Sequence, residues 1–165
     1  MNIRRIIHIA GVLGCFISAS AQENVTMRKS VLQDTAAFVR FVHSVTGVPT
    51  DTATLYELYT DGTCIKCSVL LSGVLAEMRT TETIRNVCLV MCNRRKEFQV
   101  LKKTLSGYDA CYGVFGGFRG FIEQGVSPWT QAFLLRPDGT VRLYDYDEIE
   151  KLYRQMAAER KQQSK

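Results

Sequence analysis

The chain has 165 residues, of which 46% are hydrophobic and 22% are charged. These values exclude a wholly disordered chain, a collagen and a protein with many membrane spans, and the length suits one compact domain. The formal net charge is +5, and it falls to +3 when a leader holding Arg4 and Arg5 is removed. A charge this mild gives no reason to expect a nucleic-acid partner.

The first 21 residues have the layout of a secretory signal peptide. Two arginines are followed by an apolar stretch over 6–17 and by small residues over 18–21, the order that such leaders show. We predict cleavage after Ala21 and export, to the periplasm in the simplest case, where disulfides persist. The run VLGC ending at Cys15 loosely resembles a lipobox. Lipidation there is the alternative, and the one route by which we expect a membrane attachment.

The rest of the chain predicts alternating helices and strands. Apolar spacing from Val31 to Val45 indicates a helix that stops at Gly47. The further predicted elements are a strand over 54–60, a helix over 65–78, a buried strand over 86–92, a helix over 94–105, a hairpin of strands over 129–135 and 140–146, and a last helix capped by Asp147. We therefore expect a signal peptide over 1–21, a helical extension over 22–50, the main domain over 51–156 and a solvated tail with no obvious fold over 157–165.

Residues 106–127 form a long connection. It holds six of the twelve glycines together with several aromatic residues, so it is predicted to be anchored by aromatic packing rather than to be a flexible linker. Its run GGFRGF over 116–121 lacks the strand-to-helix context of a phosphate loop and predicts a bend.

A Cys-x-x-Cys pair stands where a predicted strand ends and a helix begins. This position puts Cys64 at the helix N-terminus, where unpaired backbone N–H groups and the helix dipole stabilise a thiolate. Cys64 is the predicted nucleophile, and Cys67, one turn further on, is predicted to resolve the mixed disulfide. Lys66 between them favours the thiolate further. A static structural disulfide is the alternative interpretation.

The motifs LYTDGTCIKC and TQAFLLRPDGTV resemble those of the thioredoxin-like superfamily over about residues 54–153. The resemblance is greatest to its exported TlpA/ResA-like thiol-disulfide oxidoreductase branch. It implies an α/β thioredoxin-like fold, with a central mixed β-sheet flanked by helices and, here, an extra N-terminal helix. It also implies disulfide exchange with envelope client proteins, an upstream redox partner and no cofactor.

Two positions depart from the family pattern. Thr63 stands where the family usually has Trp, and the family's cis-proline falls on Thr130 or, with a shift of two residues, on Pro128. We expect this residue to lie beside Cys64 and to offer its backbone to an extended client segment; at Thr130 we expect a trans bond or a strained residue. The departures keep open a second class of function, a non-catalytic binding or structural module with a structural disulfide.

The other cysteines are interpreted from their spacing. Cys64, Cys67, Cys88 and Cys92 are spaced much like a zinc ribbon. The last two, however, lie about 13 Å apart along the predicted strand, which argues against a shared zinc and against a disulfide between them. We expect no metal, with Cys88 a buried small hydrophobe, Cys92 a candidate accessory thiol near the CxxC, and Cys111 in the loop.

One histidine and two carboxylates complete the candidates. His43 lies on the polar side of the first helix and is expected at the surface, so a Cys-His hydrolase is not supported. Glu57 and Asp61 are the carboxylates nearest the CxxC in sequence. One of them, if buried, could relay protons to Cys67, but the alternation of a strand does not say which faces inward.

Overall fold

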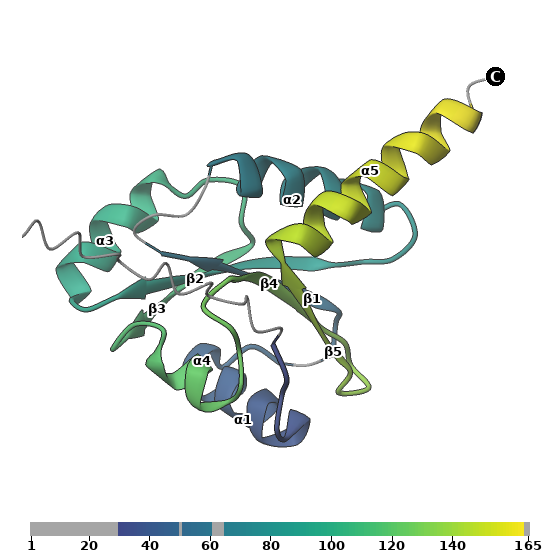
Figure 1. The fold of residues 1–165 in the computed structure, drawn as a ribbon. Coiled ribbons are helices and arrows are strands. Elements are labelled where there is room, and N and C mark those ends of the chain that lie inside the picture. The colour runs from purple at the N-terminus through teal and green to yellow at the C-terminus, as the bar shows by residue number, and fades with distance from the viewer. Residues whose placement is uncertain (1–29, 50, 61–64, 164–165) are drawn as a thin grey trace, which may run out of the picture.

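The computed structural model of the chain describes residues 30–49, 51–60 and 65–163, without the side chains of 65–68 and 160–163 (Figure 1). Its elements, in chain order, are α1 (Thr35–Thr46), β1 (Thr54–Tyr59), α2 (Ile65–Met78), β2 (Arg85–Cys92), α3 (Arg95–Thr104), β3 (Ala110–Phe115), α4 (Arg119–Glu123), β4 (Thr130–Leu135), β5 (Val141–Asp145) and α5 (Tyr146–Gln163). Every helix and strand that the sequence predicts is present, with ends shifted by a few residues at most apart from the start of α1 and the end of α5.

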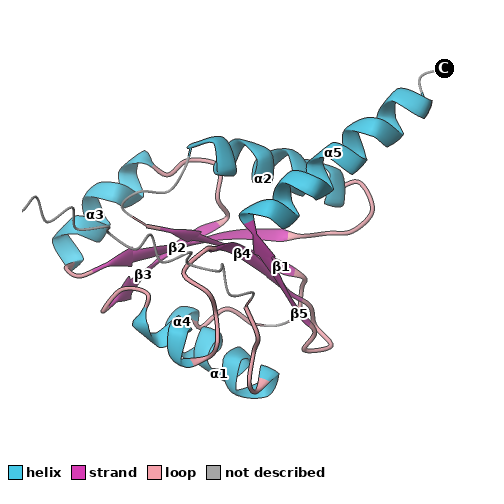
Figure 2. Cartoon of the chain, in the orientation of Figure 1, coloured by secondary structure: helices cyan, strands magenta, loops and turns pink. Residues whose placement is uncertain are grey.

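The five strands form one mixed sheet in the order β3-β2-β1-β4-β5. The pairs β1–β2 and β2–β3 are parallel, and β1–β4 and β4–β5 are antiparallel. Helices α2, α3 and α5 cover one face, and α1 and α4 cover the other (Figures 1 and 2). This is the α/β arrangement expected from the sequence, a central mixed β-sheet flanked by helices, with α1 as the extra N-terminal helix.

The first helix has the ends that its sequence predicts. The Asp34 side chain accepts a hydrogen bond from the Ala37 backbone N–H at 2.9 Å, which satisfies one of the free donors of the first turn. Gly47 ends the helix with φ at 62°, and its N–H donates to the His43 carbonyl. Val31 precedes the helix and is exposed, so the helix begins later than the apolar spacing indicated.

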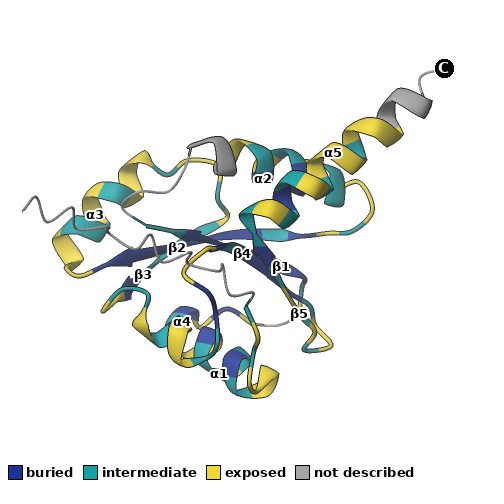
Figure 3. Cartoon of the chain, viewed as in Figure 1, coloured by how far each residue is buried: buried dark blue, intermediate teal, exposed yellow. Residues whose placement is uncertain are grey.

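Two layers of apolar side chains hold the helices to the sheet, and the central strands between them are coloured as buried in Figure 3. On the α1 and α4 face, the rings of Tyr56 and Phe133 stack at 4.8 Å, and Phe38 and Phe121 pack around them. On the other face, a second cluster lies under α2 and α5; its buried members are Ala53, Leu55, Leu71, Leu75, Ile84, Ala132, Leu134, Tyr144 and Ile149. The central strands β1 and β2 are therefore buried on both faces, as the apolar run of β2 predicted.

The long connection contains two elements that the sequence did not reveal. Strand β3 adds an edge to the sheet beside β2, and α4 brings Phe121 into the core. Cys111 therefore lies in a strand, and its expected place in a loop is wrong. Gly113 lets β3 pack closely against α3, because an added Cβ would lie 3.0 Å from the Phe98 ring. The run GGFRGF does bend, with φ positive at Gly116 and Gly117, before the first residue of α4.

The hairpin is confirmed, whereas the last helix differs at both ends. Gly139 has φ at 82°, as the Asp-Gly turn predicted. Helix α5 begins at Tyr146, so Asp147 lies in its first turn instead of capping it. Residues 157–159 are exposed, but the helix continues to Gln163 where no fold was expected, and it projects beyond the sheet (Figure 1). Among the described helices, none combines the length and apolar character that a bilayer span needs.

Candidate functional site

The predicted order of strand, CxxC and helix is present in the fold. Strand β1 ends at Tyr59 and helix α2 begins at Ile65, directly after Cys64 in the chain. Asp61, Thr63 and Cys64 lie outside the described residues, as do the side chains of Lys66 and Cys67. The roles assigned to these residues therefore stay predictions.

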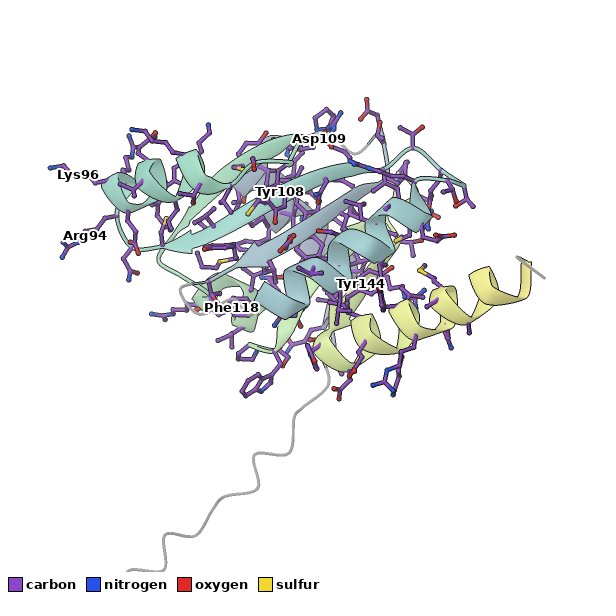
Figure 4. All side chains as sticks on the ribbon, turned by 90° about the horizontal axis from the view of Figure 1, so that it is seen from above. Arg94, Lys96, Tyr108, Asp109, Phe118 and Tyr144 are labelled. Carbon is purple, nitrogen blue, oxygen red and sulfur yellow. The ribbon has the colours of Figure 1, made fainter. Side chains whose placement is uncertain are left out.

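Glu57 is the buried carboxylate of this region. It lies in β1 with only 5% of its surface exposed, and it shares a strand face with Leu55, which packs under α2. Its Oε2 accepts a hydrogen bond of 2.6 Å from the Tyr108 hydroxyl. Figure 4 looks down on this face and shows Tyr108 over the sheet on the side that α2 and α3 cover. The structure therefore shows that Glu57 faces inward, which the alternation of the strand did not decide.

Tyr108 is a member of this site that the sequence did not single out. It lies just before β3, 51 residues from Glu57 in the chain. Burial raises its pKa, and the hydrogen bond to Glu57 and the negative charge of that carboxylate raise it further. Tyr108 therefore stays protonated and able to donate. No local signal marked it, because its partner is set by the pairing of strands far apart in sequence.

A row of side chains crosses the sheet at the level of Glu57. Glu57 is paired in register with Ala132 of β4 and with Cys88 of β2, and Cys88 is paired with Cys111 of β3. Residues directly opposite each other in neighbouring strands point to the same face. The carboxylate and the two thiols are therefore side by side beneath α2 and α3.

Cys88 is buried, with 0% of its surface exposed, as predicted, and Cys92, the candidate accessory thiol, is 2% exposed. Burial is the largest cause that raises the pKa of each thiol; the nearby Cys111 and Glu57 add to it at Cys88, and the Glu97 charge adds to it at Cys92. Both thiols are thus held in the protonated form. The strand predicted to hold both cysteines is present as β2. Among the described residues, no three His, Cys, Asp or Glu side chains come together as metal ligands.

Thr130 is the first residue of β4, the strand that pairs with β1. The last pair of the β1–β4 ladder is Glu57 with Ala132, and Thr130 lies two residues before Ala132, beyond the end of that ladder. Its backbone N–H donates to the Ser127 carbonyl at 3.0 Å, and its hydroxyl donates to Asp145 at 2.9 Å. No described peptide bond is cis, so the bonds before Thr130 and the exposed Pro128 are both trans. Their distance from Cys64 lies outside the described residues.

The histidine candidate is at the surface. His43 is exposed on α1, as predicted, and its backbone carbonyl accepts a hydrogen bond from the Gly47 N–H at the helix end.

No protein-family model matches the chain, and no curated protein matches it. Two solved structures are similar to it. One is BsSco, a member of the Sco family of cytochrome c oxidase assembly proteins in which a disulfide switch was identified; it is 14% identical, with a TM-score of 0.38 over 62% of this chain and 79% of that one. The other is a proposed thiol-disulfide oxidoreductase from Bacteroides vulgatus, 18% identical, with a TM-score of 0.35 over 59% of this chain and 63% of that one. Likeness at this level is too low to carry the activity of either protein to this chain.

Proposed function

We propose that the protein is an exported thiol-disulfide oxidoreductase that exchanges disulfides with client proteins through Cys64 and Cys67. The observation that supports this most is the junction between β1 and α2: a strand carrying the buried Glu57 leads into Cys64, and a 14-residue helix follows at once. A thiolate at a helix N-terminus is stabilised by free N–H groups and by the helix dipole.

In this mechanism the Cys64 thiolate attacks one sulfur of a client disulfide, and the other client sulfur leaves. The thiol of Cys67 then attacks Cys64 in the mixed disulfide, which releases the reduced client and leaves Cys64 and Cys67 oxidised. Glu57 is the proposed acceptor of the Cys67 proton, and Tyr108 orients its carboxylate. An upstream redox partner in the same compartment restores the starting state.

Single cysteine variants test this function. Cys64→Ser should abolish disulfide exchange in an insulin-reduction assay, whereas Cys67→Ser should trap a mixed disulfide with the client. Cys111→Ser is the matched control, because it removes a thiol of the edge strand β3 that has no part in this mechanism and should keep activity. Wild-type turnover in both CxxC variants would show that the proposal is wrong.

The rival function is a binding module that keeps the fold and a structural disulfide. It is favoured by Thr130, whose backbone N–H donates to the Ser127 carbonyl and whose hydroxyl donates to Asp145, so that neither donor is free to dock a client segment. The reduction potential of the CxxC distinguishes the two. A value below about −300 mV, together with no turnover, is expected of a structural bond, and a higher value with turnover supports the oxidoreductase.

A further inference from the structure

Two thiols outside the CxxC face each other across neighbouring strands. Cys88 of β2 and Cys111 of β3 are direct partners in a parallel ladder. Neighbouring strands lie about 4.8 Å apart, and the Cα atoms of disulfides usually lie about 4.4–6.8 Å apart, so the backbone spacing already fits a bond. Both side chains belong to the cluster that packs under α3. Neither is oxidised in the structure.

The two thiols differ in access and in charge. Cys88 is fully buried, whereas Cys111 is half-buried on the edge strand. Cys111 also lines a surface pocket of about 390 Å³, together with Lys102, Leu105 and Tyr108. This volume is within the range of small-molecule sites. A small compound can therefore reach Cys111 before it can reach Cys88.

The surroundings favour Cys111 as the attacking thiol. Burial raises its pKa, but the positive charge of Lys102 and a hydrogen bond from the Cys88 thiol both act to lower it. The same hydrogen bond raises the pKa of Cys88, as its burial does more strongly. The thiolate is thus better tolerated on Cys111, and Cys88 is the proton-bearing partner.

We propose that Cys111 and Cys88 form a second redox pair, which a small carboxylate-bearing disulfide such as glutathione disulfide oxidises to an intramolecular disulfide. Cys111 gives its proton to water and attacks one sulfur of the compound, which forms a mixed disulfide and releases one thiolate. Cys88 gives its proton to Glu57 beside it and attacks the Cys111 sulfur, which forms the Cys88–Cys111 bond and releases the second thiolate. The two released thiolates take up two protons, so two protein thiols are oxidised and one disulfide is reduced to two thiols.

Cys92 does not fit this role, although it is buried in the same strand. Its partner in register is Phe115, and four residues along the strand place it about 13 Å from Cys88. It is therefore the matched control. The pair uses neither Cys64 nor Cys67, although it shares the proton acceptor Glu57 with the mechanism proposed for the CxxC. Oxidation of the pair in a chain without Cys64 and Cys67 therefore tests this proposal separately from that function.

The test uses the full chain with Cys15, Cys64 and Cys67 replaced by Ser. The folded protein is incubated with glutathione disulfide, its remaining thiols are alkylated, and its peptides are mapped by mass spectrometry. We expect a linked Cys88–Cys111 peptide and an alkylated Cys92. Three alkylated cysteines, or a link that includes Cys92, would overturn the proposal. The peptide map is made with Cys88 and Cys111 both intact, so it does not depend on how a substitution at either residue affects folding.

Further variants in the same background test the order of attack. Cys88→Ser should accumulate a stable glutathione adduct at Cys111, Cys111→Ser should leave Cys88 unreacted, and Cys92→Ser should keep the linked peptide. An adduct that forms first at Cys88 would contradict the order. Lys102→Glu should slow oxidation several-fold more with glutathione disulfide than with uncharged hydroxyethyl disulfide. An equal effect on both compounds would refute the carboxylate preference.

Discussion

Replacing Tyr108 by Phe removes the hydroxyl that donates a 2.6 Å hydrogen bond to Glu57 and leaves the ring in place. Hydrogen bonds to charged groups contribute about 1.5–3 kcal/mol to stability. Glu57 is 5% exposed, which favours a large loss, but Tyr108 lines an open pocket from which water can reach the vacated position. We therefore expect the free energy of unfolding to fall by about 1.5–2 kcal/mol, at the lower end of the range.

Urea unfolding at neutral pH, followed by circular dichroism, measures this loss. The matched control is Tyr153→Phe, whose side chain is 42% exposed on α5 and which should change stability by less than about 0.5 kcal/mol. A double-mutant cycle with Glu57→Gln should give a coupling energy of about 1 kcal/mol or more. If Tyr108→Phe behaves like the control and the cycle shows no coupling, the hydrogen bond does not stabilise the fold as argued.

Three further outcomes follow from the structure. Gly125→Ala should lower the free energy of unfolding by more than the about 1–2 kcal/mol expected for a non-glycine residue in the left-handed region, because the new Cβ would lie 2.1 Å from the Val31 carbonyl oxygen. Gly139→Ala meets no atom within 4 Å and should lose only about 1–2 kcal/mol. Equal losses in thermal unfolding would contradict the close approach at Gly125. Thr130→Pro removes the N–H that bonds to Ser127, so urea unfolding should show a loss of about 1–3 kcal/mol, and unchanged stability would speak against this bond. Burial raises the pKa of the Tyr56, Tyr108 and Tyr144 hydroxyls above the ordinary 10.0. Their contribution to folding stability is therefore complete below about pH 10 and is lost above it, by up to about 1.4 kcal/mol per pH unit for each hydroxyl. Urea midpoints that stay constant from about pH 9 to 11 would disprove this pH dependence.

The sequence predicted most of the elements because each is encoded by a short-range pattern. The spacing of apolar residues before Gly47, the apolar run over 86–92 and the Asp-Gly turn each act within one helix, strand or hairpin. Their order then restricted the fold to a mixed sheet flanked by helices, since a strand, a crossover helix and a second strand form a right-handed parallel unit.

Strand β3 escaped prediction because its pattern is weak and its stability comes from its neighbours. It is six residues long, includes Gly113, and borders a Gly-rich bend. That glycine leaves room for the Phe98 ring, which is a requirement of tertiary packing and not of the strand itself. The local pattern of this segment therefore predicts turns, although the segment forms the edge strand of the sheet.

The sequence by itself determined the βα order around the CxxC, the apolar central strands and the hairpin, because residues a few positions apart specify these. The tertiary structure alone decided that Glu57 faces inward, that Tyr108 donates to it, and that Cys111 stands beside Cys88. The physical reason is register: strand pairing places Cys111 opposite Cys88, 23 positions away, and brings Tyr108, just before β3, to Glu57, 51 positions away. No short segment carries information about which residue of another strand will lie opposite it.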